Sequence, residues 1–268
     1  MQVKELTGLI EEYAPLSLQE SYDNAGLICG EGNREVKGVL LCTDITEEVV
    51  DEAIEGGYNL IISHHPLTLQ GLKNIRPDNS INRCLVKAIK HDLNLYAAHT
   101  NMDAVRQGVS AKMADKLGLL RQHILRPQGK LFSLIFYTPE TEAGKVREAV
   151  YRCGGGHIGN YRCCSFNSSG TGTFLPETGT HPFCGEAGKL HTEKEIKTEI
   201  TVPEHLLSRS IEVIRSVHPY EEPVINAVCL ENTCPVTGFG IVGELPQEED
   251  TMSFLRQIKE TFHCDTIR

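Results

Sequence analysis

The sequence predicts an α/β protein with a largely parallel sheet that is interrupted by an inserted α+β domain. Over residues 1–126, short apolar runs alternate with helical patterns, which is the order of a parallel sheet covered by helices. Residues 127–231 change to the order β-α-β-β-(β)-α-β, in which the strand in parentheses is an additional one; this is the ferredoxin-like order, which can form a compact unit by itself. Residues 232–268 return to the texture of the first segment. We therefore expect a core domain in two pieces around an insert.

Local signals define the elements of the first segment. Pro15 closes a helical pattern that begins at residue 2. Thr46 is expected to cap a helix that has two glutamates in its first turn, where carboxylates suit the helix dipole, and Gly56 ends that helix. The expected elements are a helix over 2–14, a strand over 36–44, a helix between Thr46 and Gly56, a strand over 59–63, a helix over 80–92 and a strand over 93–101.

The rest of the chain shows the same kind of signals. Residues 160–176, "NYRCCSFNSSGTGTFLP", are expected to form a β-hairpin. The other elements expected in the insert are strands over 131–139, 195–203 and 222–231 and helices over 142–153 and 204–217. After the insert we expect a strand over 238–246 and a helix over 251–262.

Composition and charge restrict the classes of function. Lys and Arg number 26 against 36 Asp and Glu, so the formal charge of −10 argues against general nucleic-acid binding, which needs a basic face. The N-terminal stretch has scattered charges and no apolar signal-peptide core, and no apolar run reaches the length of a membrane span. The ten cysteines include no C-x-x-C pair. We therefore expect reduced thiols and a cytoplasmic protein with no membrane partner.

Two adjacent histidines follow a buried strand in "NLIISHHPLT", residues 59–68. In parallel α/β sheets, ligands gather beyond the carboxyl ends of the strands, which is where His64 and His65 are expected. Imidazole is the commonest protein ligand for transition-metal ions. Because adjacent strand residues point to opposite sides, two neighbouring ions with one histidine each is the easier geometry. The alternative is a hydrogen-bonded turn pair.

The next strand ends in a second polar group, "AAHTNMD". His99 and Asp103 are four residues apart, so they share a face if the chain turns helical there. We interpret Asp103 as a metal ligand, because a carboxylate between cations neutralises charge. His99 is a metal ligand, a supporting residue that orients Asp103 or a structural turn former, and the sequence leaves these alternatives open. Asp44 follows a third strand as a ligand, an acceptor for a ligand or a helix cap, and we interpret it as the cap.

Other motifs are interpreted as structural. Two stretches, Gly154–Gly159 and Gly238–Gly243, match G-x-G-x-x-G but lack the strand before and helix after that a dinucleotide site needs, so we assign them to turns and packing. "HPYEEP", residues 218–223, brings His218 near Glu221 and Glu222. It is either a metal or ligand site or a proline-bounded turn, and we interpret it as the turn. Neither a P-loop nor a G-x-S-x-G nucleophile motif occurs.

Taken together, the motifs resemble a known family. "SYDNAGLICG", "LLCTDIT", "NLIISHHPL" and "AAHTNMDAV" resemble, in order and spacing over residues 1–120, the NIF3-like family, which is also named GTP cyclohydrolase 1 type 2 or DUF34. "GGGHIGNY", "GTGTF", "HPYEEP" and "GFGIVGEL" resemble the long bacterial form of that family, whose inserted domain is similar to PII and CutA proteins. The resemblance covers essentially the whole chain.

The resemblance implies a dinuclear metal centre and a homohexamer. It assigns His64, His65 and Asp103 as ligands of two divalent cations, which are Zn, Fe or Mn. The family's other ligands are a His and a Glu in an H-x-x-x-E pattern, which this chain does not contain after residue 231, since His263 is followed four residues later by Ile267. We therefore expect the chain to be truncated at its C-terminus and the ligand set to continue beyond Arg268.

Two functions remain open at this point. The first is a metal-dependent hydrolase that acts on a nucleotide or related substrate, GTP cyclohydrolase-like by resemblance, in which two cations lower the pKa of a water molecule and polarise the substrate. The catalytic group is then the water, and no side chain is assigned as the nucleophile. The alternative is a non-catalytic metal-binding or regulatory protein, whose insert senses a ligand or sets the assembly.

Overall fold

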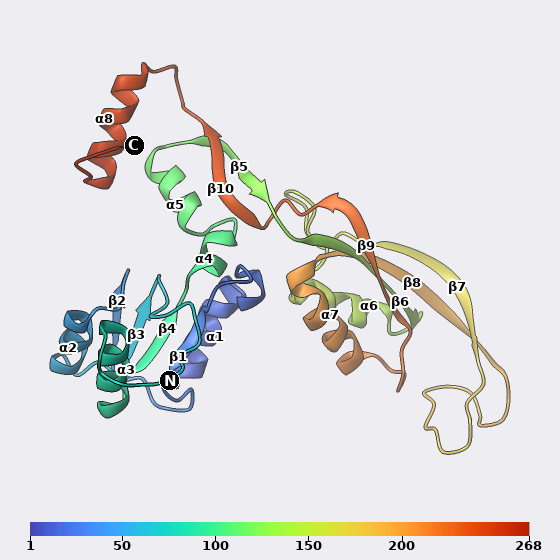
Figure 1. Ribbon diagram of the computed structural model, residues 1–268. Helices are drawn as coiled ribbons and strands as arrows, with labels where there is room; N and C mark the ends of the chain where they lie inside the picture. Colours follow the sequence, from blue (N-terminus) through green and yellow to red (C-terminus); the bar gives the residue numbers. More distant parts are fainter. Residues whose placement is uncertain (268) are drawn as a thin grey trace. The chain divides into compact units, whose positions relative to one another are not determined.

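The computed structural model describes residues 1–267, which divide into two compact units. The first unit runs from Met1 to Pro127 and resumes at Pro235, and the second is Gln128–Cys234. The first unit contains a four-stranded and a two-stranded sheet, the second contains another four-stranded sheet, and each unit has its own apolar core (Figure 1). Among the described residues, no helix is both long enough and apolar enough to cross a bilayer.

A four-stranded sheet in the order β1-β4-β3-β2 lies at the centre of the first unit. The strands β2 (Val39–Cys42), β3 (Leu60–Ser63) and β4 (Asn94–Ala97) are parallel and in register, so that all three end at the same edge. The strand β1 (Gly26–Cys29) pairs antiparallel with β4. The prediction of a largely parallel sheet is therefore confirmed.

Helices cover both faces of this sheet (Figure 1). The helices α2 (Glu47–Glu55) and α3 (Ser80–Lys90) pack on one face, because successive right-handed crossovers in one direction lie on the same side. The helix α1 (Val3–Tyr13) packs on the other face. Strand alternation decides which side chain faces which helix: Ile61 is in the core with α2 and α3, and its neighbour Leu60 is in the core with α1.

The remaining elements of the first unit follow the sheet in the chain. The short helix η1 (Leu16–Leu18) follows α1, and α4 (Thr100–Ala104) and α5 (Val109–Lys116) follow β4. The strand β5 (Leu120–Pro127) pairs antiparallel with β10 (Gly238–Glu244), and α8 (Thr251–Phe262) follows β10. The sequence analysis did not predict α5 or β5. In both segments polar and charged residues interrupt the apolar ones, so neither the helical nor the strand period is clear.

The second unit is a four-stranded antiparallel sheet with two helices. Its elements are β6 (Lys130–Pro139), α6 (Ala143–Arg152), β7 (Phe166–Phe174), β8 (His191–Pro203), α7 (Glu204–Val217) and β9 (Ile225–Thr233). The sheet order is β7-β8-β6-β9. Side chains of β6 and β8 form one core with α6 and α7. The element order is the expected one, and the relation of this unit to PII and CutA proteins stays a prediction.

The predicted hairpin over residues 160–176 is wrong. Residues 166–174 form the single strand β7, whose hairpin partner is β8, after a connection of residues 175–190. The turn signals at Asn167–Gly172 lie inside the strand, where Gly170 and Gly172 face Glu195 and Glu193 of β8. A Cβ on Gly172 would lie 2.2 Å from the Glu195 carboxylate, so this glycine leaves room for the Glu195 side chain and does not form a turn.

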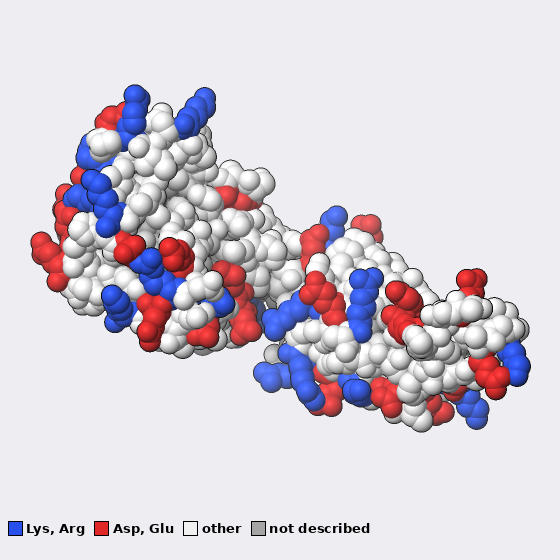
Figure 2. All heavy atoms as spheres, turned by 90° about the horizontal axis from the view of Figure 1, so that it is seen from below, with Lys and Arg blue, Asp and Glu red and all other residues white. Residues whose placement is uncertain are grey.

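Charged side chains are interspersed on the molecular surface. On the face shown in Figure 2, basic and acidic side chains lie among each other over both units, without a continuous basic area. This distribution agrees with the net charge of −10.

Candidate metal centre

Three neighbouring strand ends bring polar side chains to one edge of the first sheet. Asp44 follows β2, His64 and His65 follow β3, and His99 follows β4. Because these strands are parallel and adjacent, their carboxyl ends lie side by side. Asp103 reaches the same edge from α4, whose first turn begins at His99, and the Asp103 amide donates to the His99 carbonyl over 3.1 Å.

The two adjacent histidines converge, although strand alternation would separate them. The strand β3 ends at Ser63, whose hydroxyl donates to the His65 carbonyl over 2.7 Å and bends the chain. The His64 and His65 rings lie beyond the bend with their centroids 4.9 Å apart. The alternation of strand residues does not apply to these two histidines, because neither is part of the strand. The binding of two ions with one histidine each stays a prediction.

His99 completes a group of three imidazoles. Its ring centroid lies 5.3 Å from that of His64 and 5.4 Å from that of His65, and both pairs are close to perpendicular. One nitrogen from each of the three rings lies within 4.8 Å of the others. The sequence left open whether His99 is a ligand, a supporting residue or a structural residue, and the fold brings its ring as near to the centre as the other two.

Each of the three rings is fixed through its Nδ1 atom. The acceptors are the Ala98 carbonyl for His64 (3.0 Å), the Asp44 carboxylate for His65 (2.8 Å) and the Asp23 carboxylate for His99 (2.8 Å). Oxygen acceptors require a proton on Nδ1, so a neutral ring then presents the lone pair of Nε2. Three rings prepared in this way are typical of metal-binding histidines, whose other nitrogen donates to a carboxylate or a carbonyl.

Asp103 brings a carboxylate to the same group. One Asp103 carboxylate oxygen lies 3.7 Å from Nε2 of His64, and the two side chains are 28% and 29% exposed. The group is therefore partly enclosed but still open to solvent. Asp103 therefore lies beside His64, and the role of His64, His65 and Asp103 as metal ligands stays a prediction.

The interpretation of Asp44 as a helix cap is wrong. The cap of α2 is Thr46, whose hydroxyl accepts from the Val49 amide over 3.3 Å, as the sequence predicts. Asp44 lies two residues earlier and turns toward the strand edge instead, where it accepts from His65. Its function is therefore to hold a histidine, which was one of the alternatives that the sequence left open.

Asp23 is a site residue that the sequence reading missed. It lies in the loop before β1, far from His99 in the chain, and its side chain is fully enclosed. Its two oxygens accept from the Asn24 amide (2.6 Å), from His99 (2.8 Å) and from both the amide (3.0 Å) and the hydroxyl of Thr100. Burial acts to raise the pKa of Asp23, but the hydrogen bonds from Thr100 and His99 hold it below its ordinary value. The carboxylate therefore stays charged.

Cys42 lies next to the site but is not prepared for nucleophilic chemistry. Its carbonyl accepts from the His64 amide over 3.1 Å. Burial, helped by the charge of Asp44, raises the pKa of the Cys42 thiol. A thiol with a raised pKa is a poor nucleophile. The chemistry of the site therefore belongs to the imidazoles and carboxylates.

Comparison with known proteins identifies the family. The family model of Duf34/NIF3 (NGG1p interacting factor 3) matches residues 1–268. The chain belongs to the DUF34/NIF3 family. One curated DUF34/NIF3 relative, a GTP cyclohydrolase 1 type 2 homolog of Halalkalibacterium halodurans, is 43% identical over 97% of this chain and 70% of that protein. A relative of the same name from Bacillus subtilis is 35% identical over 99% of this chain and 72% of that protein.

Solved structures of DUF34/NIF3 proteins have the same fold. A Bacillus cereus protein related to NIF3 matches with a TM-score of 0.84 and 36% identity, over 99% of this chain and 71% of that chain. A Staphylococcus aureus protein matches with a TM-score of 0.68 and 31% identity, over 100% of this chain and 70% of that chain. The resemblance that the sequence motifs carry is therefore confirmed.

The "HPYEEP" segment of this DUF34/NIF3 protein forms a turn in which His218 is buried and the two glutamates are exposed. Nε2 of His218 donates to the Tyr137 carbonyl over 2.9 Å, and its Nδ1 accepts from the Tyr220 amide over 3.1 Å. Both ring nitrogens are therefore used within the protein, which fits the turn and not a metal site. Glu221 accepts from the His181 amide over 3.0 Å. Burial lowers the pKa of His218, although the Tyr137 carbonyl and the charge of Glu195 oppose this shift.

The stability of the protein is expected to fall as the pH drops below about 6.5, because the unfolded chain then takes up a proton on His218 and the folded chain does not. His205, whose pKa burial also lowers, contributes in the same direction. A glutamine at position 218 can keep both hydrogen bonds and cannot titrate. His218→Gln should therefore reduce the pH dependence by up to about 1.4 kcal/mol per pH unit.

Urea unfolding between about pH 5 and pH 8 measures this effect. The matched control is His157→Gln, because His157 is an exposed histidine of the same unit. If the free energy of unfolding of His218→Gln changed with pH as steeply as that of the wild type, the assignment of a neutral buried imidazole would be contradicted.

Proposed function

We propose that this protein binds divalent cations through His64, His65, His99 and Asp103 and uses them to hydrolyse a nucleotide or a related substrate. One observation carries the proposal: three histidine rings are each anchored through Nδ1, and one nitrogen of each lies within 4.8 Å of the others. His218, by contrast, uses both of its ring nitrogens inside the protein.

The chemistry of the donors fits a transition-metal ion. Imidazole nitrogens together with a carboxylate oxygen suit Zn, Fe or Mn. When bound, such cations supply Lewis acidity, which lowers the pKa of a water molecule and polarises the substrate. Asp103 adds a negative charge that offsets part of the charge of the cations. His65 is 47% exposed, so a substrate has access to the group from solvent.

The protein's own contribution is orientation. The Ala98 carbonyl, Asp44 and Asp23 each fix one imidazole ring and its tautomer. Asp44 is 64% exposed, whereas the Asp23 side chain is fully enclosed. His99 is therefore the most firmly held of the three rings and His65 the most adaptable, which suits a group that must accept a substrate beside His65.

The nature of the substrate and the assembly belong to the same proposal. Relatives at 43% and 35% identity are named GTP cyclohydrolase 1 type 2 homolog, so GTP is the first substrate to test and other nucleotides follow. We also propose the homohexamer and the second cation that the family resemblance implies. An apolar side chain on the edge strand β2, Leu41 at 72% exposure, supports an assembly through this unit.

The experiment begins with metal-free protein prepared by dialysis against a chelator. Mn, Fe and Zn are then added separately, the bound equivalents are counted by elemental analysis, and release of product from GTP, other nucleotides and phosphodiesters is measured. We expect turnover only with metal present. Turnover that survives complete metal removal would refute the mechanism. Metal-loaded protein that turns over none of these substrates would favour the non-catalytic, regulatory function.

A further inference from the structure

A second group of possible ligands lies in the other unit, on β8 and the segment before it. His191 and Glu193 are two residues apart at the start of β8, so their side chains lie on the same face of the strand. Nε2 of His191 is 2.9 Å from a carboxylate oxygen of Glu193. Cys184 comes from the 175–190 connection and forms side-chain hydrogen bonds with Glu193 and Tyr220. Ligand atoms of the three residues lie within 4.8 Å of one another.

Backbone geometry holds the cysteine against the strand. Gly185 has a φ of +85°, and a Cβ at this position would lie 2.9 Å from Cβ of His191. Only glycine can take this conformation at so short a distance from the histidine. The Pro176 carbonyl accepts from the Gly188 amide over 2.8 Å, which closes the connection into a loop. Cys184 is thus directed toward His191 and Glu193 by the chain path itself.

The environment of the three side chains suits a bound cation. His191 and Glu193 are 28% and 29% exposed, and Cys184 is half-buried. Thiolate, imidazole and carboxylate are the three side-chain types that bind Zn²⁺, and three protein ligands leave one tetrahedral position for water or another ligand. The Phe174 ring packs on His191 with centroids 5.3 Å apart and limits access of water from that side.

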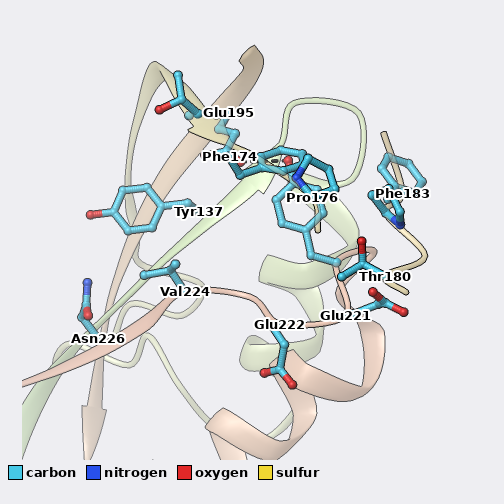
Figure 3. A pocket seen from close by; sticks show the side chains of 14 residues that line it. Tyr137, Phe174, Pro176, Thr180, Phe183, Glu195, Glu221, Glu222, Val224 and Asn226 are labelled. Carbon is cyan, nitrogen blue, oxygen red and sulfur yellow. Dashed lines mark hydrogen bonds between the residues drawn. The ribbon is translucent and has the colours of Figure 1, made fainter. Parts of the chain in front are cut away.

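The same loop forms a wall of a cavity of about 520 Å³. Pro176, Thr180 and Phe183 line it from the loop, and Phe174 and Glu195 line it from the strands (Figure 3). Phe183 is the chain neighbour of Cys184, and Phe174 contacts His191. Any restraint on Cys184 therefore also restrains the lining of the cavity.

We infer that Cys184, His191 and Glu193 form a thiolate-containing Zn²⁺ site that fastens the 175–190 loop to β8 and so holds one wall of the cavity. On binding, the S–H bond of Cys184 breaks, its proton passes to solvent, and a sulfur–metal bond forms. A cross-link from the middle of a long connection to a strand reduces the freedom of the connection. The site is independent of the histidine group in the first unit.

Cobalt(II) is the probe for this site, because a thiolate ligand gives a sulfur-to-cobalt charge-transfer absorption in the near ultraviolet that imidazole and carboxylate ligands do not give. The metal-free chain of 268 residues, kept reduced with a phosphine, is titrated with Co²⁺ and then with Zn²⁺. We expect a thiolate band that saturates and that Zn²⁺ abolishes. The histidine group contains no thiol, so the band appears whether or not the proposed function is correct.

Substitutions of single residues show which side chains produce the cobalt charge-transfer band. Cys184→Ser should abolish it, and Glu193→Gln should weaken the affinity by at least roughly 10–100-fold. Cys229→Ser, at an exposed cysteine of the same unit, is the matched control and should keep the band. Circular dichroism shows whether each variant is folded. A folded wild-type chain without the band, or a band that Cys184→Ser keeps, would overturn the site and leave only a hydrogen-bonded trio.

Proteolysis tests the effect on the loop. Trypsin cleavage after Lys189, which is 74% exposed, should be slower with Zn²⁺ in the wild-type chain and unaffected by Zn²⁺ in Glu193→Gln at the same concentration. If the wild-type chain were cleaved at the same rate with and without Zn²⁺, the inference that Zn²⁺ fastens the 175–190 loop to β8 would be overturned.

Discussion

His65→Ala is expected to lower the affinity for the catalytic cation by more than the roughly 10–100-fold that loss of a supporting residue costs. The variant removes a donor nitrogen and leaves Asp44 without its imidazole partner. Turnover should fall with the bound metal, because the proposed chemistry depends on Lewis acidity at this group. Competition with a chromophoric chelator measures the affinity, and product release at saturating metal measures the turnover.

The fold should survive this change. His65 is 47% exposed and contributes little to the core, so the free energy of unfolding should change by less than about 0.5 kcal/mol. The matched control is His91→Ala, because His91 is an exposed histidine at the C-terminal end of α3. Wild-type affinity in a folded His65→Ala variant would show that this histidine is not a ligand.

Asp23→Asn is expected to damage both stability and metal binding. Four hydrogen-bond donors converge on the enclosed Asp23 carboxylate. An asparagine side chain has one acceptor oxygen and turns an NH₂ group toward donors, so about 1–3 kcal/mol of stability should be lost. The His99 ring also loses the partner that fixes its tautomer, and metal affinity should fall by roughly 10–100-fold.

The pH dependence gives this prediction a sign. The pKa of Asp23 is held below its ordinary value, so its contribution to stability is present above the unfolded pKa of about 3.8 and is lost as the pH falls through the folded value. The difference in stability between wild type and Asp23→Asn should therefore narrow at acid pH. Asp115→Asn is the control, because Asp115 is exposed and accepts from Gln122. If the difference in stability between wild type and Asp23→Asn did not change with pH, the charged state assigned to Asp23 would be contradicted.

Local sequence signals were sufficient for the elements that bury a regular face. The strands around Leu60 and Leu95 are short and mostly apolar, and α2 begins after the threonine that the sequence assigned as its cap. These signals fail where burial is partial. The strand β5 is largely exposed and β7 is rich in serine and glycine, so neither has the apolar period on which the reading depends.

The sequence by itself determined that His64, His65 and Asp103 follow neighbouring strands of one parallel sheet, whose carboxyl ends lie at one edge. It also determined the family, because motifs in order need no coordinates. Only the tertiary structure decided which atoms hold the rings. Asp23 reaches His99 across 76 residues of chain, and Cys184 reaches Glu193 through a loop without regular structure. Such contacts depend on how separate segments pack, and no periodic pattern in the chain records them.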